Sequence, residues 1–457
     1  MNELLKQVRV IDAVSGTDQI ADVKIENGQI IDIAATIKEI PDNTEIIDCQ
    51  GLILGTGLID LYSHSGEPGF EERETMSSLL QAAAAGGFTR ICILPDTSPA
   101  IDNCAVVTQL QKLGSREWGV GSREEEKGNG EGKLSFTSPT PPSSPSSPSS
   151  PSSPTPHSPL PTPLIWGAIS HDVAGKQLTE LAELALGTVG FADGQPLENL
   201  NLVRRALEYL QLFNKPVAFW ACDKQLRSNG IMREGADAVR FGLPLTPVVA
   251  ETSAIAALLE LVVATETPVH IMRVSTARSV ELIASAKSHG LPVTCSTTWM
   301  HLLLDTKALK SYHPSLRLEP PLGNPSDVKA LREGVRAGIV DAIAIDHTPY
   351  TYEEKTVAFA DAPPGAIGYE LALALLWQHL VETGEFTALE LWQALSTNPA
   401  KCLQQEISSI TSGKKAELTL FNPHQAWKVE SKNLHTLAAN TPWYGQQLTG
   451  KVVKIWC

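Results

Sequence analysis

Short runs in which apolar and polar residues alternate mark both ends of this chain. Such alternation is typical of β-strands that bury one face. The runs lie at 7–12, 21–25, 29–33, 416–421, 427–429 and 450–456. Asn27-Gly28 is a common tight turn between antiparallel strands, so the second and third runs predict a hairpin. Neither end is long enough to bury a sheet alone, and we therefore expect the two ends to pair in one small β domain.

Between the two ends, continuous apolar runs alternate with helical patterns. The apolar runs predict eight buried strands, at 58–62, 90–94, 165–169, 189–193, 217–220, 269–273, 293–297 and 342–346. Helical periodicity predicts helices at 76–85, 178–186, 200–213, 253–265, 279–287, 327–337, 370–382 and 389–395. This order indicates an α/β protein built as a (β/α)8 TIM barrel, whose site residues lie at the carboxyl ends of the strands.

The pattern divides the chain into a barrel and one accessory domain. We expect residues 1–51 and 405–457 to form a small β-sandwich domain and residues 52–404 to form the barrel. Residues 114–163 fit neither, because a Gly/Glu-rich start passes into a Pro/Ser tract that cannot form a packed core. We interpret this segment as a disordered insertion that loops away from the barrel. A docking site for a Pro-binding partner is the alternative.

Composition and charge narrow the classes of function. Apolar content of 42% and charged content of 19% are those of a soluble globular protein. A formal net charge of -15 argues against nucleic acid or an anionic membrane as the natural partner. The seven cysteines are scattered without a CxxC pair, which favours buried thiols in a reducing compartment. With no signal peptide and no apolar run long enough to span a bilayer, the chain is expected in the cytoplasm.

The candidate chemistry begins where the first apolar run of the barrel ends. Residues 58–69 read Leu-Ile-Asp-Leu-Tyr-Ser-His-Ser-Gly-Glu-Pro-Gly. Alternate residues on a strand share a face, so Tyr62 and His64 are expected to point the same way. A histidine at both positions would form a metal-binding pair, but here one partner is a tyrosine, which is a poor ligand at neutral pH.

The same segment resembles the first-strand signature of dihydroorotases, which is D-L-H-x-H-x-R-E-P-G. Other segments that resemble this family are Leu94-Pro95-Asp96-Thr97, Val274-Ser275-Thr276, Pro320-Pro321-Leu322, Ile345-Asp346-His347-Thr348-Pro349, Asn398-Pro399-Ala400 and Gly413-Lys414-Lys415-Ala416-Glu417-Leu418. The resemblance covers nearly the whole chain and leaves out only the Pro/Ser insertion. It implies a class I-like member of the cyclic amidohydrolase superfamily, whose dihydroorotases close or open dihydroorotate and related rings in pyrimidine biosynthesis.

The resemblance implies a metal centre, and several of its positions are changed. The kept positions are His64, Asp193 and Asp346, and the replaced ones are Tyr62, Trp220 and Arg273. An indole offers no lone pair to a metal and a guanidinium is always charged, so neither is a ligand. We expect Arg273 to neutralise Asp193 or Asp346 and Trp220 to fill the space of a metal and its water. The chain is therefore predicted to use no cofactor, and a zinc ion on the kept residues is the alternative.

Positions that contact the substrate in the family are changed as well. An arginine is replaced by Gly66, asparagines by Asp96 and Glu319, and a histidine by Tyr350. The charge of Asp96 would repel an anionic substrate. His347, beside Asp346, is either an independent acid or base or a structural residue.

Three functions are compatible with this pattern. The first is a non-catalytic dihydroorotase homologue of de novo pyrimidine biosynthesis, acting in an oligomer as a structural or regulatory partner of aspartate transcarbamoylase. The second is an active dihydroorotase or related amidohydrolase with an atypical metal site and Asp346 as its catalytic residue, closing N-carbamoyl-L-aspartate to dihydroorotate. The third is a small-molecule binder in which Arg273 anchors an anion. The joint loss of metal and substrate positions on an intact scaffold favours the first.

Overall fold

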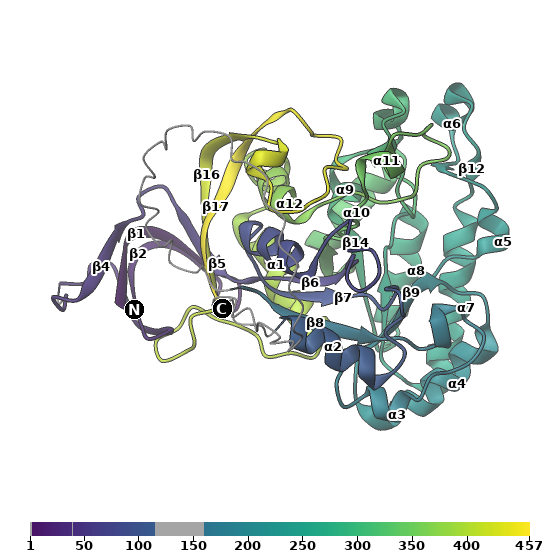
Figure 1. Ribbon diagram of the computed structural model, residues 1–457, viewed down its shortest axis with the longest axis horizontal. Coiled ribbons are helices and arrows are strands. Elements are labelled where there is room, and N and C mark those ends of the chain that lie inside the picture. Colours follow the sequence, from purple (N-terminus) through teal and green to yellow (C-terminus); the bar gives the residue numbers. More distant parts are fainter. Residues whose placement is uncertain (1, 39, 115–159) are drawn as a thin grey trace, which may run out of the picture.

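An eight-stranded parallel sheet forms the centre of the computed structural model, which describes residues 2–38, 40–114 and 160–457 (Figure 1). Most of the predicted insertion at 114–163 therefore lies outside the described residues. The strand order is β15-β14-β13-β10-β9-β8-β7-β6. The strands are β6 (Leu58–Ser63), β7 (Phe88–Ile93), β8 (Thr162–Gly167), β9 (Gly190–Pro196), β10 (Val217–Trp220), β13 (Val269–Met272), β14 (Val293–Thr298) and β15 (Ala342–Ala344).

The two edge strands of this sheet meet, so the sheet is nearly closed. Asp346 N donates to Tyr62 O over 3.2 Å, and His64 N donates to His347 O over 2.9 Å. These bonds join the carboxyl ends of β6 and β15. The prediction of a TIM barrel is confirmed, and each of the eight predicted strands overlaps a strand of the barrel.

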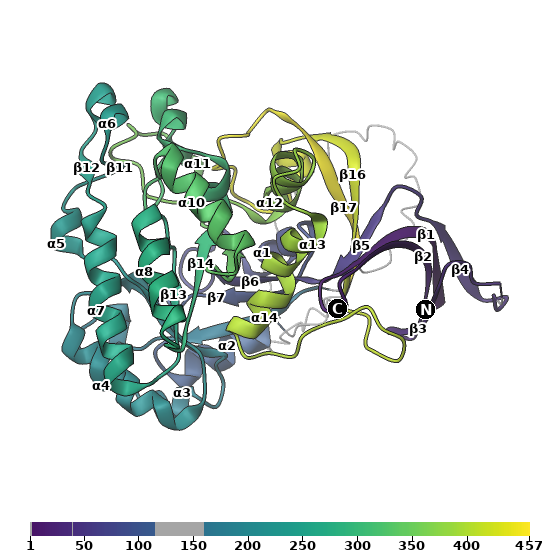
Figure 2. The same cartoon turned by 180° about the vertical axis from the view of Figure 1, so that it is seen from behind.

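Helices cover the outside of the barrel, as the two opposite views show (Figures 1 and 2). The longer ones are α1 (Met76–Ala85), α2 (Cys104–Gly114), α4 (Leu200–Leu210), α7 (Val249–Thr265), α8 (Ala277–Ser288), α10 (Pro325–Arg336) and α12 (Tyr369–Leu376). Shorter elements are α3 (Leu181–Leu184), α5 (Lys224–Arg227), β11 (Met232–Arg233), α6 (Ala236–Phe241), β12 (Leu245–Thr246), α9 (Trp299–Leu303), α11 (Tyr352–Lys355), α13 (Ala388–Trp392) and α14 (Asn398–Cys402). Local signals set the ends of α1: Thr75 Oγ1 accepts a hydrogen bond from Ser78 N, and the helix stops at Gly86.

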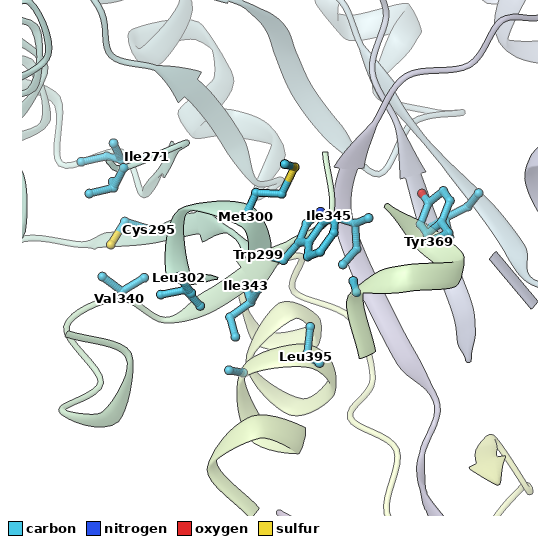
Figure 3. Close-up of a cluster of buried hydrophobic side chains, with 14 of the residues drawn as sticks. Ile271, Cys295, Trp299, Met300, Leu302, Val340, Ile343, Ile345, Tyr369 and Leu395 are labelled. Carbon is cyan, nitrogen blue, oxygen red and sulfur yellow. The ribbon is translucent and has the colours of Figure 1, made fainter. Parts of the chain in front are cut away.

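Alternate residues of the barrel strands serve two separate cores. Inside the barrel lie Ile59, Leu61, Tyr62, Cys92, Leu94, Trp166, Ala192, Trp220 and Met272, among others. The indole of Trp166 donates to Leu61 O over 2.8 Å within this interior. The outer core lies between the strands and the helices, and Figure 3 shows part of it, with Ile271, Cys295 and Ile343 of the strands near Leu302 of α9. The barrel interior is thus filled by side chains.

Both ends of the chain contribute to a seven-stranded sheet beside the barrel. Its path is β17-β16-β5-β1-β2-β3, and β4 also pairs with β1. The strands are β1 (Asn2–Asp12), β2 (Thr17–Glu26), β3 (Gln29–Ala34), β4 (Thr44–Asp48), β5 (Ile53–Thr56), β16 (Leu418–Lys428) and β17 (Gln447–Trp456). The prediction that the two ends pair in one β-rich domain is confirmed. Because β5 belongs to this sheet, the terminal domain extends past the expected boundary at residue 52.

The connection between β16 and β17 reaches across to the rim of the barrel. Asn440 Nδ2 donates to Thr348 O over 2.9 Å, and Tyr350 N donates to Asn440 Oδ1 over 3.1 Å. Farther along, the Trp443 ring packs against Trp299 with centroids 5.2 Å apart. The terminal domain therefore holds in place the segment that follows β15, which forms one wall of the pocket described below.

Candidate functional site

A pocket of about 200 Å³ lies at the carboxyl ends of the barrel strands. Its wall contains most of the residues predicted from the sequence, namely His64, Gly66, Asp96, Trp220, Arg273, Glu319, Asp346 and Tyr350. Tyr62 and Asp193 are not part of the wall. Because TIM barrels place their chemistry at this end, the pocket is the candidate functional site.

Arg273 and Asp346 form a bidentate ion pair at the base of the pocket. Arg273 Nε donates to Asp346 Oδ2 over 2.9 Å, and Nη2 donates to Oδ1 over 2.7 Å. Both residues have positive φ, 57° and 52°, in a region that non-glycine residues rarely adopt. Although burial favours the neutral acid, the guanidinium holds the pKa of Asp346 well below its usual range. Asp346 is therefore a charged acceptor, and each of its oxygens is hydrogen-bonded to Arg273.

His64 extends this pair into a row of four charges. Its Nδ1 donates to Asp96 Oδ2 over 2.6 Å, and its Nε2 lies 3.1 Å from Arg273 Nη2 and 3.7 Å from Asp346 Oδ1. Burial lowers the pKa of the imidazole, but the carboxylates of Asp96 and Asp346 together raise it to about 9. When the imidazole is protonated, His64 and Arg273 lie side by side between the two carboxylates, and the four charges cancel.

Two aromatic side chains surround the guanidinium of Arg273. The centroid of Trp220, which is 4% exposed, lies 4.9 Å from Arg273 Cζ, and that of Tyr62 lies 5.5 Å away. The Tyr62 hydroxyl accepts a hydrogen bond from Arg273 N over 3.0 Å and is 3.0 Å from Ser296 Oγ. Burial raises the pKa of Tyr62 well above its usual range, so it remains a neutral phenol. Tyr62 therefore supports Arg273 from the barrel interior.

Asp193 lies apart from this row, contrary to the expectation that it shares one centre with His64 and Asp346. Its carboxylate accepts hydrogen bonds from Ile169 N at 2.8 Å, Ser170 N at 3.0 Å and Ser170 Oγ at 2.7 Å. These partners follow β8, the neighbouring strand, so the carboxylate closes the turn there. Of the two pairings left open for Arg273, the structure has the one with Asp346.

The outer wall of the pocket holds the remaining predicted residues. Glu319 lies between two guanidinium groups: its Oε2 is 2.7 Å from Arg227 Nη1, and its Oε1 accepts from Arg317 Nη2 over 3.3 Å. The hydroxyl of Tyr350 has no hydrogen-bond partner in the part of the chain that the structure describes. A side chain at position 66 would overlap backbone atoms of Phe70 and Glu74, so only glycine fits there.

Several polar residues of the wall were not predicted from the sequence, among them Arg73, Gln195 and His301. Arg73 comes from the loop after β6, Gln195 from the end of β9 and His301 from α9. His301 is neutral, because burial lowers its pKa to about 4. Gln195 and Arg73 lie in polar stretches without a motif, so only the folded chain places them at the pocket. His270, buried below the pocket, contacts Thr294 and Ser296 rather than the pocket.

Two further features are absent from the residues that the structure describes. No group of three or more His, Cys, Asp or Glu side chains is placed to hold a metal ion together. Likewise, none of the helices in the described ranges is long and apolar enough to cross a membrane.

Comparison with known proteins supplies the context of this site. The model of the amidohydrolase family matches residues 247–457. A probable dihydroorotase-like protein of Synechocystis sp. is 42% identical over 456 residues, which cover 98% of this chain and 98% of the relative. A dihydroorotase of Syntrophus aciditrophicus is 34% identical over 455 residues, which cover 99% of this chain and 97% of the relative.

Solved structures with the same fold are also found. L-hydantoinase (dihydropyrimidinase) from Arthrobacter aurescens superimposes with a TM-score of 0.77 at 20% identity, covering 98% of this chain and 93% of its own. Dihydropyrimidinase from Brevibacillus agri gives a TM-score of 0.74 at 19% identity, covering 100% and 93%. At these identities the likeness concerns the fold: a barrel with a β-rich domain.

Proposed function

This chain belongs to the dihydroorotase-like amidohydrolase family, and we propose that it is a non-catalytic member. The observation that carries the proposal is the position of Arg273, whose guanidinium engages both oxygens of Asp346 and lies 3.1 Å from His64 Nε2. Asp346 is the residue expected to accept and donate the proton if the chain were active. In an ion pair with a permanent cation it is a poor base, because its pKa is depressed.

The residues of the pocket do not fit a zinc ion. Zinc needs at least three protein ligands with free lone pairs. Both Asp346 oxygens accept from Arg273, and Trp220 offers no lone pair. His64 Nδ1 faces Asp96, and its Nε2 lies 3.1 Å from Arg273 Nη2. An ion ~4 Å from the guanidinium would also meet a repulsion of about 8 kcal/mol at an effective dielectric constant of about 20. The proposal therefore includes no metal cofactor.

The biological role we propose is that of a cytoplasmic, structural or regulatory subunit in pyrimidine biosynthesis, with aspartate transcarbamoylase as its partner. The scaffold supports this role, because the barrel and the terminal sheet are present, while the replacements Tyr62, Trp220 and Arg273 stand at the strand ends. The net charge of -15 gives no reason to propose nucleic acid or a membrane as the partner. Co-purification with aspartate transcarbamoylase is the expected result. A transcarbamoylase that is equally stable and active without this chain would contradict it.

The central test combines metal content with ring closure. The full chain is produced in zinc-supplemented medium, dialysed against a mild chelator and analysed by mass spectrometry. Ring closure of N-carbamoyl-L-aspartate is then measured with and without added Zn²⁺. We expect far less than one zinc per chain and no activity. The dihydroorotase of Syntrophus aciditrophicus, prepared in parallel, is the positive control. Near-stoichiometric zinc together with turnover would instead establish an active enzyme with an atypical metal site.

A further inference from the structure

The connection between β16 and β17, residues 429–446, is named the strap and is drawn in yellow in Figure 1. One part of it reaches the pocket wall, where Asn440 Nδ2 donates to Thr348 O and Tyr350 N donates to Asn440 Oδ1. A second part, residues 435–437, directs three successive backbone N–H groups at acidic side chains of the barrel. The strap, and with it this wall of the pocket, therefore depends on how those acidic side chains are charged.

Two glutamates from different parts of the barrel hold residues 435–437. Glu370, in the first turn of α12, accepts hydrogen bonds from His435 N over 2.9 Å and from Thr436 N over 3.2 Å. Glu74, just before α1, accepts one from Leu437 N over 3.3 Å and another from Thr436 Oγ1. The two glutamates and this tripeptide form a cluster that is named the clasp.

The two carboxyl groups of the clasp are close enough for one to influence the charge of the other. Glu74 is 0% exposed, and its carboxylate disfavours a second negative charge on Glu370. Burial is the larger effect: it raises the pKa of Glu370 from an ordinary 4.5 to about 7, although the N–H groups of His435 and Thr436 favour the charged form. Glu370 therefore changes its charge near neutral pH.

Three other titratable side chains face the clasp. Lys451 of β17 lowers the pKa of Glu370 and thus acts against Glu74. The imidazole of His435 has its pKa lowered by burial and by Lys451, so it adds no charge at neutral pH. His347 Nε2 lies 3.5 Å from Glu74 Oε2. None of the three side chains donates a hydrogen bond to Glu370 in the described part of the chain, so backbone N–H groups alone bind its oxygens.

From this geometry we propose that the clasp is a pH-sensitive fastening, which holds the strap while Glu370 is protonated and loosens it, together with the pocket wall beside Asn440, when Glu370 ionises. Ionisation leaves two buried carboxylates on one tripeptide, and opening the clasp lets water solvate the second charge. Because the pKa of Glu370 is higher in the closed clasp, the stabilisation is fully present below pH ~4.5 and is lost as the pH rises through about 7. The clasp residues are not part of the pocket wall, so the inference does not depend on whether the chain is catalytic.

Hydrogen exchange of the full-length chain at pH 6 and pH 8, followed by mass spectrometry, tests this proposal. Protection factors remove the intrinsic pH dependence of exchange and report how often each segment opens. We expect protection of residues 435–446 to fall about tenfold between the two pH values, because opening releases a carboxyl whose pKa drops from about 7 to ~4.5. The amides of Tyr350 and Ile367, which donate to Asn440, should fall with them. A fall that leaves Tyr350 and Ile367 unchanged, or no fall at all, would overturn the proposal.

Glu370→Gln is the decisive variant, because it keeps an acceptor for the backbone N–H groups and cannot ionise. We expect its protection of residues 435–446 to stay within about twofold between pH 6 and pH 8. Glu382→Gln is the matched control: Glu382 is exposed shortly after α12, and the variant should behave as the parent does. An equal fall in the parent and in Glu370→Gln would assign the effect to another group and overturn the proposal.

Lys451→Met tests the same charge from the opposite side and leaves both glutamates in place. Removing this cation takes away a charge that favours ionised Glu370, so the pH at which protection is half lost should move upward. Exchange is measured at half-unit steps from pH 5.5 to pH 8.5. A midpoint that stays in place or moves downward would contradict the role of Glu370.

Discussion

At the scale of single residues, the pocket depends on how Arg273 and Asp346 cancel each other's charge. Arg273→Leu leaves a buried carboxylate without its cation, so we expect the free energy of unfolding to fall by ~3–5 kcal/mol. The double variant Arg273→Leu/Asp346→Leu should recover much of this loss, because no charge is left unpaired. Urea denaturation at neutral pH measures both. Arg204→Leu is the control: its partner Glu208 is about half exposed, and the expected cost is ~0–1 kcal/mol. Equal losses for Arg273→Leu and Arg204→Leu would contradict the argument.

The protonation of His64 makes the same cluster sensitive to pH. Burial opposes the charge of the imidazole, but Asp96 and Asp346 raise its pKa to about 9, against ~6.5 in an unfolded chain. The folded state therefore binds this proton more tightly. The stabilisation is fully present below pH ~6.5 and is lost as the pH rises toward about 9, by ~1–3 kcal/mol. Unfolding by urea across this range tests the slope, and His64→Gln should flatten it. An unchanged slope in the variant would assign the effect to another group.

The sequence predicts which residues stand near the pocket better than it predicts their ion-pair and hydrogen-bond partners. The replacements Tyr62, Trp220 and Arg273 stand at strand ends, so their place near the pocket follows from the strand pattern. Arg273 pairs with Asp346, while Asp193 accepts hydrogen bonds from the Ser170 backbone and from Ser170 Oγ, which follow β8. No local sequence pattern predicts these contacts. Arg73 was missed because the loop that carries it has no motif.

At the scale of elements, the ends of a helix could be predicted where the sequence has a capping residue or a terminating glycine. The helix at 76–85 has both a capping residue and a terminating glycine, and its predicted and observed bounds agree. The predicted helix at 370–382 instead divides into α12 and a π-helical turn, Trp377–Val381, a change of winding that the apolar pattern does not predict. The short parallel pair β11 and β12 was not predicted, since two-residue strands carry no periodicity.

The loop from Gly66 to Glu74 is an element whose shape depends on one residue. Gly66→Ala would place a Cβ onto the carbonyl oxygens of Glu74 and Phe70, which cannot yield as a flexible side chain would. We expect a loss of ~1–3 kcal/mol in the free energy of unfolding, measured by urea denaturation. Gly16→Ala is the control, because its Cβ meets nothing within 4 Å and only its positive φ of 72° opposes the change. A Gly66→Ala variant as stable as the parent would mean that the loop rearranges at little cost.

At the scale of the whole molecule, the fold joins segments that are far apart in sequence. The terminal sheet was predictable from two short end segments, since neither could bury a face alone. The order of its strands was not predictable, because β5 lies between β1 and β16 and pairs with both. Glu3 shows the same long-range dependence: buried near the amino terminus, it accepts a hydrogen bond from Trp456 Nε1 over 2.9 Å.

The described residues on either side of 115–159 lie next to each other, and this makes the segment removable. Gly114 ends α2 so close to the Pro163 ring that a Cβ there would overlap it, and Thr162 already pairs with Arg90 of β7. A short Gly/Ser linker can therefore join the two ends, and a shorter loop costs less entropy to close. We expect a chain with 115–159 replaced by such a linker to keep its melting temperature within a few degrees. Thermal denaturation followed by circular dichroism measures this. A large fall in melting temperature would show that the segment contributes to the folded barrel, because the excision leaves the pocket residues and the terminal sheet untouched.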